Sequence, residues 1–306
     1  MNYTNQIMRI VSCFFLFLIL TLSSSLFANR GLEIALLSDK NNEGYGDSSS
    51  SMTMELISKK GDVVTRELRF KRLEVPEDGD KSIAVFESPR DVKGVAILSY
   101  AHKQEADDQW LYLPALKRVK RIASKNKSGP FLGSEFSFED FSFQEVEKYE
   151  YEYVKEENYL GKDCFVIKRI PLDPYSGYTK QLVWIDKENY LVQKIHHFDR
   201  KAFHLKTQTF DEYKKYLGFF WQPHKIEMKN HQNGKSSILK FAEVSFKKGL
   251  TDKDFSQNSL KRVRIKDGTI NSISNEILAM VFVNINCHHR FWCKLIRQKE
   301  KTKFKI

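Results

Sequence analysis

Histidine is the residue type in this sequence best suited to metal binding or acid–base chemistry, and there are eight histidines. His196 and His197 are adjacent in a segment with the pattern of a β-strand, so their side chains point to opposite faces. Asp199 shares a face with His197, but no third ligand stands at a matching spacing. The others lie at scattered turns and strand ends, among them His102, His204, His224 and His231. We therefore expect exposed or half-buried strand histidines rather than a metal site.

Other patterns that could carry chemistry are equally sparse. The sequence has no HExxH, no CxxC, no Gly-rich phosphate loop and no G-x-S-x-G elbow. The segment CHHRFWC (Cys287–Cys293) could bind a metal or close a small disulfide, but we favour an incidental cluster. The carboxylate pairs Asp107-Asp108 and Glu139-Asp140 resemble loop-surface or helix-start charges. The sequence thus predicts a protein that is not an enzyme and that needs no metal and no cofactor.

The net charge of +11 is unevenly distributed along the chain. Residues 262–306 carry ten Lys or Arg against only three acidic residues, whereas residues 29–261 are close to neutral. A groove that follows phosphates needs its positive charge on the folded domain itself. We therefore expect no nucleic-acid partner.

The first residues have the layout of a secretory signal peptide. Arg9 precedes an apolar run over residues 10–22, which is too short to span a bilayer comfortably, and small residues surround a cleavage point after Ala28. Residues 1–28 are therefore expected to be removed on export. Cys164, Cys287 and Cys293 remain, and these cannot form a disulfide framework, so the fold must rest on an ordinary core.

The elements that would position any site are mostly strands. Residues 29–51 predict a short amphipathic helix followed by a Gly/Ser/Asp/Asn connector, and from Met52 about a dozen strand-length runs alternate with turn signals. In Arg66–Phe70, apolar Leu68 and Phe70 alternate with charged residues, which is typical of a sheet with one dry face. Regular short strands of this kind predict an antiparallel meander, sandwich or barrel.

Several stretches resemble the periplasmic family of outer-membrane lipoprotein-sorting proteins, which are related in fold to the LolA and LolB lipoprotein carriers. The most specific is QWLYLPALKRVKRI (Gln109–Ile122) followed by GSEFSFED (Gly133–Asp140). Further similar stretches are RELRFKRLEV, FESPRDVKGVAIL, SGYTKQLVWIDKENYLVQKI and GLTDKDFSQNSLKRV. The resemblance extends from about Met52 to Val263, which is most of the expected mature chain.

This resemblance implies a fold and a class of function. The fold is mainly β: a strongly curved antiparallel sheet of about 11 strands forming an incomplete, half-open barrel over residues 29–263, with short helices or loops covering its mouth. The function is carriage or binding of lipids or acylated lipoproteins in the periplasm, with an exporter of the resistance-nodulation-division (RND) type as an expected partner. The resemblance transfers no ligand-contact residues, because the LolA and LolB carriers do not share these motifs.

The segment SGPFLGSEFSFEDFSFQE (residues 128–145, the Phe-rich segment) is the candidate cover of such a barrel. It holds five phenylalanines within thirteen residues: Phe131, Phe136, Phe138, Phe141 and Phe143. Ser137 with Asp140 three residues later resembles a weak capping arrangement, which would start a short helix with Phe138 and Phe141 on one side. Two interpretations stay open, a movable lid over a lipid cavity and a fixed plug that fills the barrel end.

Three tryptophans and one basic strand complete the candidate ligand contacts. Trp110, Trp184 and Trp221 each lie in an expected strand, where they would line a cavity or pack as core or rim. The basic residues of Leu116–Lys127 either form the solvent face of a strand or contact anionic head groups or an acidic partner; they include Lys117, Arg118, Lys120 and Arg121.

Residues 264–306 extend beyond the resemblance and form a basic tail. Their apolar run over residues 277–285 is too short to span a membrane, although a basic amphipathic end could lie on a membrane surface. We expect this tail to be poorly ordered. For the protein as a whole, the alternative to a carrier is a non-catalytic envelope scaffold that docks to an exporter or to an outer-membrane complex.

Overall fold

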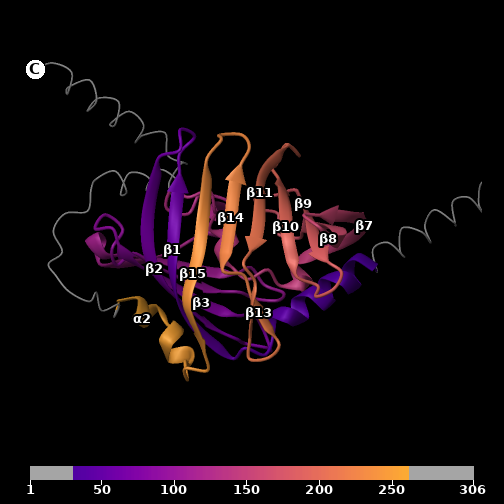
Figure 1. Ribbon diagram of the computed structural model, residues 1–306. Helices are drawn as coiled ribbons and strands as arrows, with labels where there is room; N and C mark the ends of the chain where they lie inside the picture. The colour runs from indigo at the N-terminus through magenta and orange to yellow at the C-terminus, as the bar shows by residue number, and fades with distance from the viewer. Residues whose placement is uncertain (1–29, 262–306) are drawn as a thin grey trace, which may run out of the picture.

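The structure, a computed structural model, describes residues 30–261. The expected signal peptide, the basic tail and the CHHRFWC cluster lie outside these residues. Thirteen strands form one antiparallel sheet in the order β6-β5-β4-β3-β2-β1-β15-β14-β11-β10-β9-β8-β7, and β12 and β13 form a separate hairpin (Figure 1). The sheet does not close, because β6 and β7 lie at its two ends. The expected incomplete antiparallel barrel is thus confirmed.

The first half of the sheet is a meander that runs outward from β1. Its strands are β1 (Asp47–Ile57), β2 (Val63–Leu73), β3 (Lys81–Ser88), β4 (Ala96–Tyr100), β5 (Asp108–Leu113) and β6 (Arg118–Arg121). The second half runs inward from the other edge through β7 (Tyr149–Tyr159), β8 (Lys162–Pro171), β9 (Lys180–Asp186), β10 (Val192–Phe198), β11 (His204–Asp211), β14 (Lys225–Asn230) and β15 (Ser236–Phe246). β15 pairs with β1 and joins the two halves.

One expected strand is divided in two. The run Phe219–Asn230 looks continuous in sequence, but Pro223 has no N–H to give to a sheet. The run therefore splits into β13 (Phe220–Gln222), which pairs with β12 (Lys214–Tyr216), and β14, which belongs to the large sheet. This short hairpin was not expected from the sequence, and it adds to the number of strands.

Helical elements are short and cover the two faces of the sheet. The N-terminal helix (residues 30–39), expected from its amphipathic pattern, continues into η1 (Lys40–Asn42). Gly31 packs so closely on β7 that a Cβ atom would come within 2.7 Å of the backbone at Glu152 and Tyr153. The other short helices are η2 (Pro114–Leu116), η3 (Ser124–Asn126), η4 (Glu139–Phe141), η5 (Val146–Lys148), η6 (Asp252–Phe255) and α2 (Gln257–Lys261).

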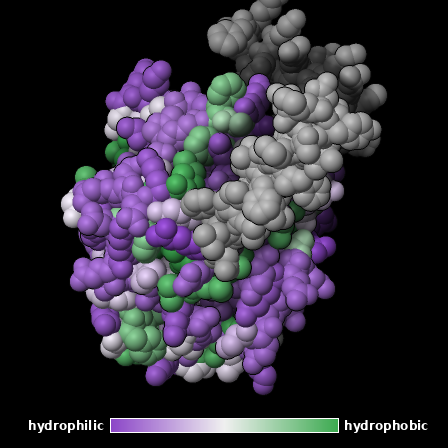
Figure 2. Space-filling model, turned by 90° about the vertical axis from the view of Figure 1, so that its right-hand side faces the viewer, coloured by the Kyte–Doolittle hydropathy of each residue, from purple (hydrophilic) through white to green (hydrophobic). Residues whose placement is uncertain are grey.

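Both faces of the sheet are apolar over part of their area. On the inner face, the largest hydrophobic cluster combines strand residues such as Met54, Leu68 and Leu111 with the Phe-rich segment. On the outer face of β3, β4 and β5, Ile83 and Leu98 are covered by buried side chains from η6 and α2. Seen from the side of β7 and β8, the surface is mainly hydrophilic with smaller hydrophobic patches (Figure 2). No helix within residues 30–261 has both the length and the apolar character that a membrane span needs.

Candidate functional site

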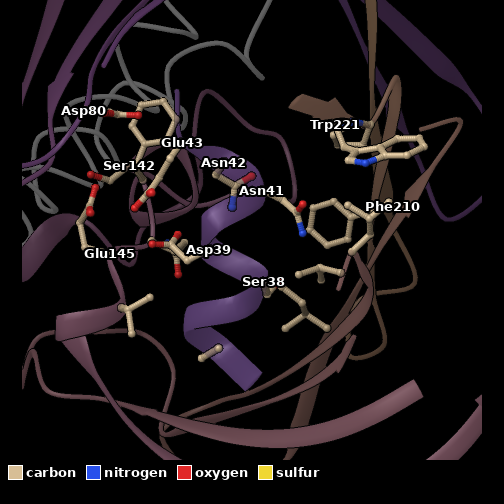
Figure 3. Close-up of a pocket in the computed structure, with 18 of the residues that line it drawn as sticks. Ser38, Asp39, Asn41, Asn42, Glu43, Asp80, Ser142, Glu145, Phe210 and Trp221 are labelled. Carbon is tan, nitrogen blue, oxygen red and sulfur yellow. The ribbon is translucent and has the colours of Figure 1, made fainter. Parts of the chain in front are cut away.

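A cavity of about 770 Å³ lies between the inner face of the curved sheet, the Phe-rich segment and the N-terminal helix (Figure 3). Its lining comes from strands that are far apart in the sheet order, including Phe70 on β2 and Val183 on β9. Because these strands line one space, the sheet must curve around it. The volume lies within the range of about 300–1,000 Å³ that is usual for small-molecule sites.

One side of the cavity is formed mainly by apolar side chains. Strand alternation turns every second residue of β9, β10, β14 and β15 inward, and these residues include Val183, Ile195, Ile226 and Phe241. Phe210 and Trp221 stand together on this side in Figure 3.

The Phe-rich segment contributes to both the core and the cavity. Phe131, Phe136 and Phe138 are buried in the main hydrophobic cluster, and Phe141 packs partly buried against it. The ring centroids of Phe131 and Phe141 are 4.1 Å apart, and those of Phe131 and Phe138 are 5.4 Å apart. Phe136, Phe141 and Phe143 line the cavity, whereas Phe131 and Phe138 do not. The segment thus forms a wall whose rings are shared between the core and the cavity.

Buried polar contacts fix this segment to the sheet at several points. Nη1 of Arg66 donates to the carbonyl oxygen of Leu132 at 2.7 Å, and Nε2 of Gln109 donates to that of Phe138 at 2.8 Å. The carboxylate of Glu135 accepts from Nδ2 of Asn230 at 2.7 Å. Such contacts hold a segment in one place, since each would leave a buried polar group unpaired if it broke.

The short helix expected after Ser137 is present as the single turn η4. The carboxylate of Asp140 accepts hydrogen bonds from both the N–H and the hydroxyl of Ser137, each at 2.7 Å, and a further one from Tyr178. Glu139 accepts from the Ser176 hydroxyl at 2.9 Å. The pair Glu139-Asp140, which resembled loop-surface charge in the sequence, is therefore half-buried and anchors the segment to the connection before β9.

The three candidate tryptophans lie in different environments. Trp221 lines the cavity. Trp110 belongs to the outer-face cluster and packs edge-on against Tyr100, with ring centroids 5.0 Å apart. Trp184 is also on the outer face, where its ring packs with His196 and lies under the ammonium group of Lys194 at 3.8 Å. Trp221 therefore lines the cavity, whereas Trp110 and Trp184 pack on the outer face.

The basic candidates lie on an edge strand, away from the cavity. Lys117 occupies the left-handed turn before β6 with φ 47°, and Arg118, Lys120 and Arg121 follow on β6 itself. Nε of Arg121 donates to Asp108 on the neighbouring strand at 3.0 Å. Of the four, Lys117, Arg118 and Arg121 are exposed and Lys120 is half-buried. They form a positive stripe along one end of the open sheet.

The opposite side of the cavity is acidic, and no sequence pattern predicted it. Asp39 from the N-terminal helix, Glu43 after η1, Asp80 before β3 and Glu145 at the end of the Phe-rich segment lie together there, hereafter the acidic side (Figure 3). Burial, with neighbouring carboxylates adding to it, raises the pKa of Asp39 to about 6 and that of Glu145 to about 7. Burial also raises the pKa of Asp80.

His196 and His197 face opposite sides of the sheet as expected, but His197 and His224 are buried rather than exposed or half-buried. His197 faces inward, is buried between Gln181 and Gln208, and lines the cavity. Burial lowers the pKa of His197 to about 3, so it is neutral. His196 faces outward and packs against His204, with ring centroids 4.4 Å apart and the rings tilted by 32°. Within residues 30–261, no three His, Cys, Asp or Glu side chains are arranged to hold a metal ion.

The fold defined by this open sheet and its covered inner face is that of the LolA superfamily. A LolA superfamily protein from Nitrosomonas europaea superposes with a TM-score of 0.61 at 19% identity, over 74% of this chain and 97% of the other. A DUF1329 family protein from Desulfovibrio piger gives a TM-score of 0.72 at 27% identity, over 76% and 99%. At 19% identity, the likeness to the Nitrosomonas europaea protein concerns the fold alone.

A more similar structure defines the family. An outer membrane lipoprotein-sorting protein domain from Vibrio parahaemolyticus is 51% identical, with a TM-score of 0.75 over 77% of this chain and 100% of that domain. A family model described as an uncharacterized protein matches residues 78–262. No curated protein matches the chain. The chain belongs to the outer membrane lipoprotein-sorting protein family, as the sequence resemblance predicted.

Proposed function

We propose that the chain is a periplasmic carrier or binding protein for lipids or acylated lipoproteins, which holds acyl chains without chemical catalysis. The observation that carries this proposal is the cavity of about 770 Å³ with the apolar side chains of Ile195, Phe210 and Ile226 in its lining. Burial of an acyl chain there gains about 0.8 kcal/mol per methylene group. No nucleotide or metal is needed for such a gain.

The Phe-rich segment is, in this proposal, a fixed wall rather than a lid. Three of its rings are buried in the main cluster, and its backbone is bonded to Arg66 and Gln109. Phe136, Phe141 and Phe143 then contact the acyl chain together with Trp221. The other cover of the cavity is the N-terminal helix, whose contacts with the sheet include the exposed ion pair Arg30–Glu156.

The experiment is mass spectrometry of lipids that co-purify with the protein in detergent-free buffer. Ile226 and Glu227 are adjacent on β14 and face opposite sides of the sheet, so Ile226→Trp fills the cavity and Glu227→Trp is its matched control. We expect acyl chains on the wild type and on Glu227→Trp, and a strongly reduced load on Ile226→Trp. Equal loads on all three proteins, or no acyl chains on any, would contradict the proposal.

The stripe on β6 is the proposed contact for anionic head groups or an acidic partner, an RND-type exporter being the partner that the family resemblance implies. Exposed cations such as Arg118 attract an anionic surface in a salt-dependent manner. Replacing Arg118 and Lys120 by Gln should weaken binding to vesicles that contain anionic lipid, with little effect on the acyl load. Unchanged vesicle binding at low salt would argue for the solvent-face interpretation.

A further inference from the structure

The cavity lining holds an excess of negative charge. Seven carboxylate side chains line it, but only three cationic ones, Arg72, Lys103 and Arg169. Each cation already donates within the protein: Arg72 to Gln222 at 2.8 Å, Lys103 to the carbonyl oxygen of Pro76 at 2.7 Å, and Arg169 to Gln144 at 3.3 Å. None of the three forms a salt bridge with any group in residues 30–261.

Several of the lining carboxylates accept hydrogen bonds, but none of them forms a salt bridge within residues 30–261. Glu74 accepts from the backbone N–H of Gly44 and Gly46, and Asp140 accepts from Ser137 and Tyr178. On the acidic side, Asp80 accepts from the Tyr45 hydroxyl at 2.6 Å, Asp39 accepts from the Asn42 side chain, and Glu145 accepts from the backbone N–H of Asp80. Neither Asp39 nor Glu145, however, forms a salt bridge within the described part of the chain. Burial of carboxylates without a counter-charge is unfavourable, so this side is arranged to receive a cation.

A hydroxyl group on the same side has no hydrogen-bond partner among the described residues. Ser142 lines the cavity beside Glu145 and is only 7% exposed (Figure 3). Its Oγ forms no hydrogen bond with any of the described residues. Buried hydroxyl groups in folded proteins nearly always have a partner, and an unpaired one calls for an explanation such as a ligand. The Ser142 hydroxyl and the carboxylates of the acidic side are therefore placed to bind the same hydrogen-bond donor of a ligand.

A primary ammonium group fits this site better than a metal ion does. The described His, Cys, Asp and Glu side chains offer no three-ligand metal arrangement. An ammonium group instead has three N–H donors that can reach acceptors spread over a wider space. The acidic side lies across the cavity from the apolar lining that carries Phe210 and Trp221 (Figure 3), so a ligand that satisfies both would have an ammonium group at one end and an apolar chain that extends across the cavity.

We propose that the cavity selects amine-bearing lipids, with the ammonium group bound by Asp39, Glu145 and Ser142 and the acyl chain lying against the apolar lining. This inference rests on the proposed carrier function and narrows its cargo. Charge-assisted hydrogen bonds are about twice as strong as neutral ones and would supply the selectivity. A lipid with an anionic head group and no amine would instead be repelled by the excess of carboxylates.

The test uses three probes that share a twelve-carbon chain: dodecylammonium, dodecanol and dodecanoate. Their affinities are measured by displacement of the neutral dye N-phenyl-1-naphthylamine from the full chain at pH 8. We expect dodecylammonium to bind about tenfold more tightly than dodecanol, as one charge-assisted contact would provide, and dodecanoate to bind most weakly. If the dye and dodecanol bind but dodecylammonium binds no better, this inference is wrong and the carrier proposal stands. If neither the dye nor any probe binds, both fail.

Isosteric variants test which residues cause the preference for dodecylammonium over dodecanol. The double variant Asp39→Asn, Glu145→Gln should bring the affinity for dodecylammonium to that for dodecanol, and Ser142→Ala should reduce the preference in part. The matched control Glu105→Gln, Glu188→Gln removes two carboxylates from exposed loops and should retain the preference. Thermal melting of each variant checks folding, because neutralising Asp39 and Glu145 removes repulsion and is not expected to destabilise the protein. A preference that survives in the double variant overturns the assignment.

Discussion

The carboxylate of Glu135 lies 2.7 Å from Nδ2 of Asn230 and joins the Phe-rich segment to the end of β14. Asn233 donates to the same carboxylate at 3.2 Å, and the Ser237 hydroxyl accepts from the N–H of Glu135 at 3.0 Å. Glu135 and Asn230 are both buried. The wall of the cavity is therefore joined to the end of β14 and the start of β15 by polar contacts, in which Glu135, Asn230 and Ser237 are buried and Asn233 is exposed.

Removing this fastening should destabilise the whole fold. Glu135→Ala leaves Asn230 with a buried, unpaired amide, which costs about 1–3 kcal/mol of unfolding free energy. Urea denaturation followed by fluorescence measures the loss. Glu243→Ala removes an exposed carboxylate on β15 as the control and should change the midpoint little. A Glu135→Ala midpoint equal to that of the control would show that the fastening contributes nothing.

Two phenylalanines of the same segment should behave differently. Phe131 is fully buried in the main cluster, and Phe131→Ala should cost about 3–5 kcal/mol. Phe143 is half-buried and lines the cavity, so Phe143→Ala should cost no more than about 1–2 kcal/mol and should weaken dye binding. If the segment were a mobile lid, Phe131→Ala would instead reduce ligand uptake and leave the melting temperature unchanged.

The positions of the tryptophans predict which one reports on a bound chain. A brominated fatty acid quenches indole fluorescence on contact, and Trp221 lines the cavity while Trp110 and Trp184 pack on the outer face. Quenching should disappear in Trp221→Phe and persist in Trp110→Phe and Trp184→Phe. Equal quenching in all three variants would place the bound chain elsewhere.

The preference for an ammonium ligand should depend on pH. With pKa values of about 6 for Asp39 and about 7 for Glu145, both are ionised at pH 8 and mainly protonated at pH 5, where the negative charge of the acidic side falls. The affinity ratio of dodecylammonium to dodecanol should decrease over this range. The other charged groups lining the cavity near this side are Glu43, Arg72, Glu74, Asp80, Lys103, Glu147 and Arg169. The Asp39→Asn, Glu145→Gln protein should show a flat profile, and a constant ratio in the wild type would contradict the prediction.

Glu139 should make a separate contribution to stability. Burial, together with the charge of Asp140, raises its pKa from 4.5 to about 7. The folded chain thus holds this proton more tightly than the unfolded chain does, so the contribution is fully present below about pH 4.5 and is lost as pH rises to about 7. Compared with Glu139→Gln, the wild type should lose unfolding free energy over this interval, as urea titrations at several pH values would reveal. An unvarying difference between the two proteins would contradict the assignment.

The strands could be predicted because local alternation determines them. The hairpin around Lys60 and Gly61, and the last strand over residues 236–246, form where the sequence indicated. The face of Trp184 could not be predicted, since β9 is apolar on both sides: Val183 packs inward and Trp184 outward. Alternation shows that neighbouring residues point in opposite directions, but not which direction is the interior.

The acidic side could not be predicted for a different reason. Asp39 ends the N-terminal helix, whereas Asp80 and Glu145 lie in connections. Long stretches of chain separate the three, and each looks like ordinary surface charge in its local context. Only the folding of the curved sheet brings these segments to one side of the cavity. Their proximity is a property of the tertiary structure, whereas a motif search detects spacing along the chain.

The pairing of β1 with β15 constrains the order in which the strands of the sheet can fold together. Ser51 and Ala242 are partners in the middle of the sheet, yet almost the whole described chain lies between them. The flanking meanders contain mainly neighbouring pairings and can form early, whereas this central seam closes a very long loop and forms slowly. The cavity has no complete wall before that step, so its ability to retain a ligand is acquired only when folding is nearly finished.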